Sequence, residues 1–478
     1  MKILKKILGI SLLLTGMVVA GCSFAPIEIP TDEDTDQGDD ENDGRRVVKF
    51  EVLKAGLGTE VYKNLERAYE AAHPDVNIKC IFNYQINEEI GARLDSGTNL
   101  ADLYSIRDFK TITDYYILGK VRDLTDIYDQ EIESGKTLRQ LMDPEAVEYC
   151  EYNGHQLCVP EYTNVNGFVY NKKLFDQYHW SVPQTTEEMV TLATKILSDT
   201  GSRVKPFIYC GNDADGYIYY LLNSINASYK GLANMKEFLK YESPEIFNPA
   251  NNNGKLYALR CLKNWFSEGS NPQFIYEGSI GLKSMDAQQA LLQGKAAMML
   301  NGSWFENEMA NFLDENDDIA MFRVPEYSEG GAVLREEGYT TSGGKKLLQC
   351  EYTANYFIPT AAANQADAID FLKFINRTDM CELYTKTCNS IRPFDYNKDP
   401  DSAIYSSMTN FGKSVLNIAN TNYLYVPSSK SQLAYEGKIS IWPNPGDNYH
   451  YKALLRDGET PESCLTREYN FAKTAMAS

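Results

Sequence analysis

Apolar residues in the first structured part of the chain recur with the period of a strand and then with that of a helix. The run VVKFEVL from Val47 predicts a strand, and apolar positions at helical spacing follow between residues 61 and 72, before Pro74. VNIKCIF (76–82) and ADLYSI (101–106) predict two more strands, with a helix around 88–94 between them. Strands that alternate with helices form parallel sheets, so this part predicts a parallel α/β sheet.

Residues 284–304, SMDAQQALLQGKAAMMLNGSW, predict a helix followed by a central strand. Ser284 is expected to cap the helix and Gly294 to end it. The run AAMML is short enough to be a strand buried on both faces. Turn-forming residues 301–303 then bring Trp304 to the carboxyl end of that strand, where open α/β sheets place their ligands. Trp304 is the first candidate binding residue, and a packing tryptophan is the alternative.

The N-terminus has the pattern of an export signal. Three lysines precede an apolar run over residues 7–20 that is too short to span a bilayer. The run ends in VAGC, which resembles the bacterial lipobox, whose cysteine is lipidated and becomes the new N-terminus. We therefore expect residues 1–22 to be a signal peptide with its lipobox. Cys22 would carry a lipid anchor that includes palmitate and hold the protein on the extracytoplasmic face of the cell membrane.

Residues 23–46 have the composition of a disordered tether. Nine carboxylates fall between Glu28 and Asp43, the segment also contains Pro26 and Pro30, and such a segment repels itself and buries no core. A calcium loop starting at Asp39 is the alternative. Its twelfth position is Phe50, where a bidentate carboxylate is needed, which argues against calcium.

Composition narrows the possible functions. A chain of 478 residues implies two or three domains, and its net charge of -20 argues against a nucleic-acid partner. Besides Cys22 there are nine cysteines, an odd number, and no pair has zinc-motif spacing; the four histidines are scattered. We expect no metal and no cofactor. In the hairpin around Asn153-Gly154, Cys150 would face Leu157 rather than Cys158, which disfavours a disulfide between the two cysteines.

Several segments in the same order resemble the carbohydrate-type solute-binding proteins of bacterial ABC importers, the maltose-binding-protein-like group. They are the lipobox, the strand ending in ADLY, VPEYTNVNGFVYNKKLF with PQTTEEM, QGKAAMMLNGSW and DAIDFLKFIN. The resemblance implies a two-lobe α/β periplasmic-binding-protein-like fold with a hinge and an interlobe cleft. Crossings are expected near residues 160, 325 and 395. Lobe 1 would be residues 47–160 and 326–395, and lobe 2 would be residues 161–325 and 396–478.

Candidate ligand contacts come from strand ends and from the resemblance. The loops after the first and third strands place Gly58, Arg107 and Asp108 at carboxyl ends. By resemblance, Trp304 matches the family's stacking tryptophan and Asp108 a ligand-contacting aspartate. Asn164 stands where maltose-specific relatives have a glutamate, which leaves the particular sugar open. The further candidates in the expected cleft are Tyr162 and Trp442.

The sequence thus predicts a monomeric, lipid-anchored binding protein that captures a mono- or oligosaccharide for the permease subunits of an ABC transporter and performs no catalysis. Sugars offer apolar C–H faces and many hydroxyls, so aromatic platforms combined with carboxylates and amides suit them. One alternative is a cell-surface lipoprotein glycosidase, for which no carboxylate pair can be singled out. The other is the same fold binding a peptide, a polyamine or a metal.

Overall fold

The computed structural model describes residues 44–54, 56–107, 109–133, 135–251, 253–328, 346–426 and 451–477. The signal peptide with Cys22, most of the tether, Asp108 and Trp442 lie outside the described residues. Within the described ranges, no helix has the length and apolar character needed to cross a membrane.

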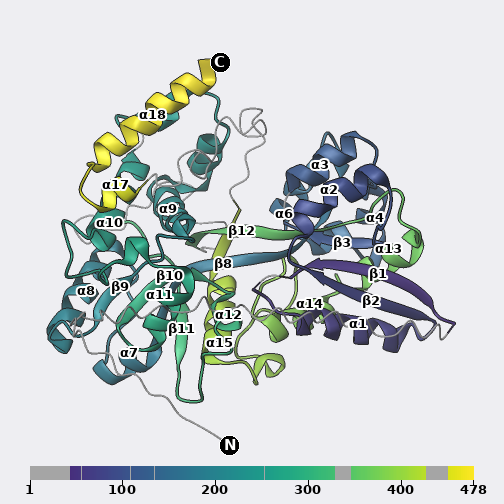
Figure 1. The fold of residues 1–478 in the computed structure, drawn as a ribbon, viewed down its shortest axis with the longest axis horizontal. Helices are drawn as coiled ribbons and strands as arrows, with labels where there is room; N and C mark the ends of the chain where they lie inside the picture. Colours follow the sequence, from purple (N-terminus) through teal and green to yellow (C-terminus); the bar gives the residue numbers. More distant parts are fainter. Residues whose placement is uncertain are drawn as a thin grey trace, which may run out of the picture. The chain divides into compact units, whose positions relative to one another are not determined.

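A sheet of nine strands organises the described chain (Figure 1). Its order is β2-β1-β3-β12-β8-β10-β9, with β11 paired to β8 and β13 to β12. Its strands are β1 (Arg46–Leu53), β2 (Val76–Asn83), β3 (Leu103–Ile106), β8 (Val159–Asn171), β9 (Lys205–Ile208), β10 (Ala296–Gly302), β11 (Ile319–Phe322), β12 (Lys346–Phe357) and β13 (Asn422–Tyr425). Two small ladders pair β4 (Glu131–Glu133) with β5 (Lys136–Thr137), and β6 (Glu151–Tyr152) with β7 (His155–Gln156).

Helices flank these strands. The longer ones are α1 (Glu60–Ala72), α2 (Ile86–Ser96), α3 (Phe109–Ile117), α7 (Lys172–Tyr178), α8 (Thr186–Thr200), α9 (Ile218–Leu239), α10 (Asn253–Phe266), α11 (Ser284–Leu292), α13 (Gln365–Phe374), α14 (Thr378–Cys388), α15 (Asn410–Thr421) and α18 (Pro461–Ala477). The short ones are α4 (Thr125–Tyr128), α5 (Leu138–Leu141), α6 (Pro144–Tyr149), α12 (Phe305–Glu308), α17 (Lys452–Leu455) and the 3-10 turns η1 (Asp215–Tyr217), η2 (Pro244–Phe247), η3 (Ser279–Gly281) and η4 (Ala403–Tyr405).

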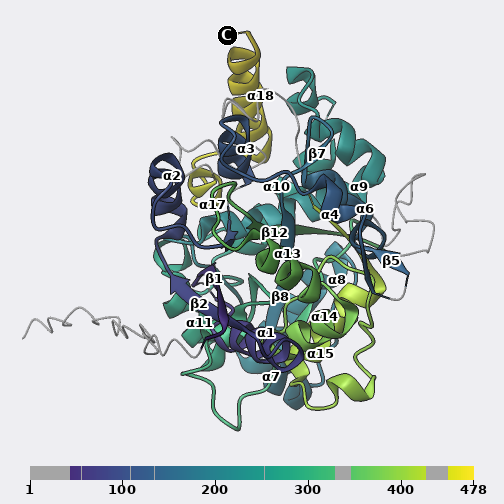
Figure 2. The ribbon, with the colours of Figure 1, turned by 90° about the vertical axis from the view of Figure 1, so that its right-hand side faces the viewer.

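The first three strands confirm the predicted parallel arrangement. β1 pairs in parallel with both β2 and β3, and α1 and α2 provide the connections. The amphipathic α1 buries Val61, Leu65 and Tyr69, and α14 packs beside it (Figure 2). Strands and helices together enclose a first hydrophobic core that contains Phe50 and Leu103.

The predicted helix and central strand before Trp304 are also present, with shifted ends. Ser284 is the first residue of α11 rather than its cap, and its backbone N–H donates to the Asp213 carboxylate at 2.7 Å. β10 is buried along its whole length, as expected, and it lies between β8 and β9 in the sheet. It continues through Gly302, so the predicted turn residues Asn301 and Gly302 belong to the strand.

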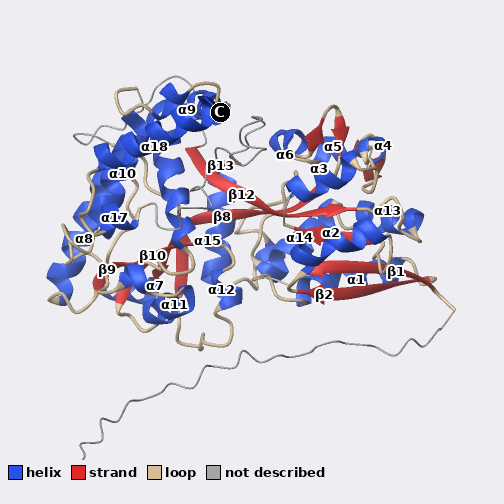
Figure 3. Ribbon diagram, turned by 45° about the horizontal axis from the view of Figure 1, so that its top comes forward, coloured by secondary structure: helices blue, strands red, loops and turns tan. Residues whose placement is uncertain are grey.

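Strands β8 and β12 connect the first core to a second one. Val159 and Tyr162 of β8 lie in the first core, whereas Val165 and Phe168 lie in the second. Along β12, Leu348 and Cys350 belong to the second core, and Tyr352 and Tyr356 belong to the first. Figure 3 shows these two strands running between two helix-flanked groups of strands. The fold is therefore the predicted α/β arrangement of two lobes.

A third connection lies beside β8. The backbone N–H of Thr163 donates to the carbonyl of Ile391 at 2.7 Å, and Ile391 belongs to the second core, whereas Phe394 belongs to the first. The chain returns from the second core to the first within β12, after Cys350. The exact bounds of the two lobes stay a prediction.

A buried carboxylate attaches β8 to the first core. Glu161 is fully buried and accepts hydrogen bonds from Tyr62 of α1 at 2.7 Å and from Tyr384 of α14 at 2.9 Å. Ser105 of β3 donates to its second oxygen. Three elements of the first core therefore converge on one residue of the crossing strand. An isolated buried charge is costly, and these donors offset that cost.

The hairpin around Asn153-Gly154 forms with a two-residue turn. The N–H of Leu157 donates to the carbonyl of Cys150 at 3.0 Å, so these two residues face each other as predicted. Nevertheless, the sulfur atoms of Cys150 and Cys158 lie 3.4 Å apart. None of the nine described cysteines forms a disulfide.

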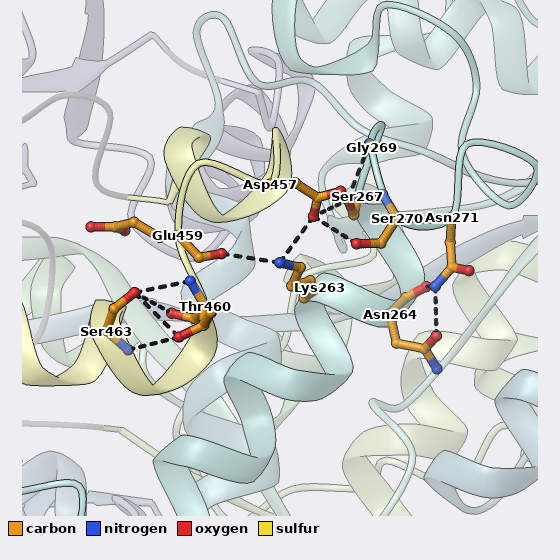
Figure 4. Close-up of polar contacts among 10 residues, drawn as sticks. All are labelled: Lys263, Asn264, Ser267, Gly269, Ser270, Asn271, Asp457, Glu459, Thr460 and Ser463. Carbon is orange, nitrogen blue, oxygen red and sulfur yellow. Dashed lines mark hydrogen bonds and ion pairs between the residues drawn. The ribbon is translucent and has the colours of Figure 1, made fainter.

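The C-terminal helices are fastened to the second core by the polar contacts drawn in Figure 4. Lys263 of α10 lies 2.9 Å from Asp457 and donates to the carbonyl of Glu459 at 3.0 Å. Asp457 also accepts hydrogen bonds from Ser267 and Ser270. These contacts hold α17 and α18 against α10.

We predict that Glu161→Ala strongly destabilises the protein. Hydrogen bonds to a charged group contribute about 1.5–3 kcal/mol each, so the loss of three should lower the free energy of unfolding by about 4.5 kcal/mol or more. Urea unfolding measures this difference. Glu277→Ala, at an exposed glutamate, is the control and should change the free energy by less than about 0.5 kcal/mol. Equal values for the two variants would contradict the anchoring role of Glu161.

Candidate binding site

A cavity of about 300 Å³ lies where the two crossing strands pass from one core to the other. The lining residues come from the β1–α1 loop, the end of β3, both crossing strands, the start of α9 and the segment after β10. They are Gly56, Leu57, Arg107, Tyr162, Asn164, Tyr217, Tyr220, Trp304, Glu308, Glu351, Tyr352 and Thr353. Ligand sites of binding proteins are concave and carry a few convergent polar groups, and this lining has that character.

Gly302 leaves the space that the indole ring of Trp304 occupies. A Cβ atom on Gly302 would lie 2.0 Å from Cζ3 of Trp304, so the indole folds back over a residue that has no side chain. Trp304 is 9% exposed and stands immediately before the short helix α12. Glu308 lies one helical turn further on, and its N–H donates to the Trp304 carbonyl at 3.0 Å. The aromatic ring and the carboxylate therefore reach the cavity from one turn of chain.

Two tyrosines complete the aromatic wall. Tyr217 and Tyr220 lie three residues apart at the start of α9, on one face of the chain. Their ring centroids are 5.5 Å and 6.4 Å from that of Trp304, with tilted planes. The Tyr220 ring meets the indole edge to face and the Tyr217 ring meets it at a tilt, and such contacts stabilise aromatic clusters.

An irregularity in β12 supplies polar groups. The register with β8 shifts between Tyr352 and Ala354, so Thr353 is the extra residue of a bulge. Bulges redirect side chains, and here both Tyr352 and Thr353 line the cavity. The amide of Asn164 on β8 donates to the Thr353 hydroxyl.

Two half-buried carboxylates face the cavity. Burial raises the pKa of Glu351, while the hydrogen bond from Tyr220, at 2.7 Å, and the positive charge of Arg107 oppose the rise. Burial likewise raises the pKa of Glu308, against the effect of a 3.0 Å hydrogen bond from Gln288. Both carboxylates are acceptors that have lost part of their hydration, and donors of a ligand would replace it.

Arg107 and Tyr162 line the cavity from the side of the first core. Arg107 follows β3, and its backbone carbonyl accepts a hydrogen bond from the Asn355 amide at 3.3 Å. Tyr162 is 5% exposed, and burial raises the pKa of its hydroxyl, which therefore stays a neutral donor.

The structure brings four of the predicted contact residues together: Trp304, Arg107, Tyr162 and Asn164 all line the cavity. Gly58 does not line it. That glycine is exposed with a φ of 73°, while Gly56 and Leu57 of the same loop form the wall. Asp108 and Trp442 lie outside the described residues.

Sequence reasoning missed Tyr217, Tyr220, Glu308 and Glu351. The three-residue spacing of the two tyrosines could have indicated that they share one face of the chain. Glu308 follows Trp304 by four residues, and this spacing could have indicated that it lies near the tryptophan. Glu351 stands among mostly apolar neighbours in KLLQCEYTANYF, which marks a polar position on a buried strand.

A larger cavity of about 790 Å³ lies elsewhere, among α5, α6, the end of α15 and residues 395–398. Its charged groups already have partners: Arg139 pairs with Asp129 at 2.8 Å, and Asp395 pairs with Lys136 at 3.4 Å. Its tyrosine, Tyr396, is covered by the Lys398 ammonium at 4.5 Å. Cavity volume alone therefore does not identify the binding site. The side chains of the smaller cavity are better suited to bind a ligand.

No group of three or more histidine, cysteine, aspartate or glutamate side chains suited to a metal ion occurs among the described residues.

Two hydrophobic cores joined by crossing strands, with a lined cavity at the crossing, define a two-lobe binding protein. The chain belongs to the family described as bacterial extracellular solute-binding protein, whose profile matches residues 54–380. Among curated proteins there is no significant sequence match.

Solved structures with the same fold cover nearly the whole chain. Apo RafE from Streptococcus pneumoniae has a TM-score of 0.65 at 17% identity, over 90% of this chain and 98% of RafE. The GacH receptor of Streptomyces glaucescens, solved without ligand and with acarbose, has a TM-score of 0.61 at 15% identity, over 91% and 99% of the two chains. Lmo0181 from Listeria monocytogenes, in complex with cycloalternan, has a TM-score of 0.62 at 15% identity, over 91% and 99%.

We predict that Gly302→Ala displaces the indole of Trp304, because the added methyl group would occupy the position of the ring. Quenching of tryptophan fluorescence by acrylamide should increase, since the ring becomes more exposed. The same comparison in a Trp304→Phe background isolates the signal of this residue. Gly281→Ala is the control, because a Cβ there meets no atom within 4 Å. Unchanged quenching in Gly302→Ala would show that the ring does not depend on the glycine.

Proposed function

We propose that this chain captures a mono- or oligosaccharide in the cavity beside Trp304 and presents it to the permease of an ABC importer, without catalysing a reaction. The observation that carries the proposal is the grouping of Trp304, Glu308 and Glu351 in one cavity at the crossing of the two cores. An aromatic ring packs against the C–H face of a sugar, and desolvated carboxylates accept hydrogen bonds from its hydroxyls.

The family and the fold support this proposal. RafE has also been solved in complex with raffinose, and another protein of the same fold is named a chitin oligosaccharide binding protein. These ligands belong to those proteins, which share at most 17% identity with this chain. They make carbohydrates the first class of ligand to test.

In this proposal the protein is a monomer. A lipid on Cys22 holds it at the extracytoplasmic face of the membrane, and residues 23–46 form its tether. The tether would let the binding domain reach the permease. The two lobes, residues 47–160 with 326–395 and residues 161–325 with 396–478, would close around the ligand. Asp108 and Trp442 remain proposed contacts from the sequence.

A glycosidase is the second candidate, because Glu308 and Glu351 place two carboxylates with raised pKa values in one cavity. Glycoside hydrolysis uses such a pair as acid and base or nucleophile. Release of a chromophore from nitrophenyl glycosides would identify the enzyme, whereas a binding protein saturates without turnover.

A thermal-shift screen against a library of sugars tests the proposal directly. A ligand that binds only the folded state raises the melting temperature, by an amount that grows with its concentration over Kd. A library without any stabilising sugar, and with a stabilising peptide or polyamine instead, would overturn the choice of ligand class.

Trp304→Ala should weaken binding of the sugar found in this screen by about thirtyfold, since truncation of a buried aromatic anchor costs about 2 kcal/mol. Calorimetric titration measures the loss. If Trp304 only packs, the variant should instead lower the stability of the ligand-free protein by about 3–5 kcal/mol and bind normally. Trp180→Ala is the matched control: Trp180 is 6% exposed, donates to Asp199 and does not line the cavity, so its loss should reduce stability and leave affinity unchanged.

Cys22→Ser should leave the protein without its lipid and therefore absent from the membrane fraction. Cell fractionation followed by detergent extraction measures the distribution. Cys80→Ser, which lies far from the N-terminal signal in sequence, serves as the control and should stay membrane-bound. A Cys22→Ser protein that remains in the membrane fraction and needs detergent for release would contradict lipidation at this residue.

A further inference from the structure

The β1–α1 loop approaches the aromatic wall of the cavity at one glycine. A Cβ atom on Gly56 would lie 3.3 Å from Cβ of Trp304 and 3.2 Å from Oε1 of Glu308. These separations are shorter than ordinary van der Waals contact, so a side chain at residue 56 would push Trp304 and Glu308 away from the loop by a few tenths of an ångström or more.

The two sides of this contact belong to different cores. Leu57, next to Gly56, is buried in the first core, whereas Phe305 and Met309, which enclose the turn that carries Glu308, are buried in the second. Gly56, Trp304 and Glu308 also line the same cavity. The contact therefore joins the two lobes directly at the edge of the proposed site.

We propose that Gly56 is the point at which the two lobes meet when the site closes, and that the missing side chain allows this closure. Gly56 is thus a positioning residue: it acts by letting Trp304 and Glu308 come under the β1–α1 loop. The inference rests on the proposed function, since closure matters only if the cavity holds a ligand.

Backbone geometry does not explain this glycine. Gly58 in the same loop has a φ of 73°, a conformation that favours glycine, whereas the φ of Gly56 is not positive. A substitution at position 56 therefore tests the effect of filling the space beside Trp304 and Glu308, without adding backbone strain. A larger side chain acts as a wedge and lowers the fraction of molecules that can close, and the apparent affinity falls by the same fraction.

The test compares Gly56→Ala and Gly56→Val with the unmodified protein, using glucose, maltose and raffinose as probes in calorimetric titrations. We expect a severalfold loss of affinity for the alanine variant and at least a tenfold loss for the valine variant. Small-angle scattering at saturation should give a larger radius of gyration for Gly56→Val than for the unmodified protein. Gly281→Val is the control, because a Cβ at Gly281 meets nothing within 4 Å, and it should match the unmodified protein.

A readout without ligand keeps the inference separate from the proposed function. The wedge should expose the indole, so acrylamide quenching of Trp304 should increase in Gly56→Val, measured against the same change in a Trp304→Phe background. If none of the three sugars binds the unmodified protein but quenching increases, the lobe contact is supported and the choice of ligand is wrong. Unchanged quenching together with unchanged affinity, or unchanged quenching when no probe binds, would overturn the role of Gly56.

Discussion

The antiparallel pairing of β8 with β12 is the constraint on which the rest of the structure depends. A strand of 13 residues such as β8 spans roughly 40 Å, long enough to contribute side chains to two separate cores. Its N-terminal end is held in the first core through Glu161 and its C-terminal end packs in the second through Phe168. The residues between these ends lie at the boundary of both cores, and polar side chains can be placed there without interrupting either one.

The binding chemistry follows from this boundary. Asn164 and Glu351 face each other across the pair of crossing strands, and the bulge at Thr353 adds a hydroxyl to the same surface. The second lobe contributes the rings of Trp304, Tyr217 and Tyr220, and the first contributes the loop with Gly56. Because every wall comes from a different element, relative movement of the lobes changes the spacing of the walls without unfolding either core. The same arrangement explains why a small cavity with convergent groups is a better candidate than the larger one among α5, α6 and α15.

Much of the fold could be predicted from local patterns, because strands such as 47–53 and helices such as 61–72 are encoded in the period of their apolar residues. Trp304 could be found for the same reason, since it follows a short apolar strand. The pairing of β8 with β12 could not, because it joins segments almost two hundred residues apart and depends on tertiary packing. The bulge at Thr353, the contact of Gly56 with Trp304 and the approach of the Cys150 and Cys158 sulfurs are likewise consequences of tertiary geometry that periodicity does not contain.

The most direct test of this account is a crystal structure of the protein with the sugar that stabilises it most. We expect the sugar between the Trp304 ring and the Glu351 carboxylate, with the β1–α1 loop closed over it at Gly56 and its hydroxyls bound to Glu308 or Glu351. A sugar bound in the larger cavity beside Asp395 and Lys398, or one that touches none of the residues around Trp304, would contradict the account.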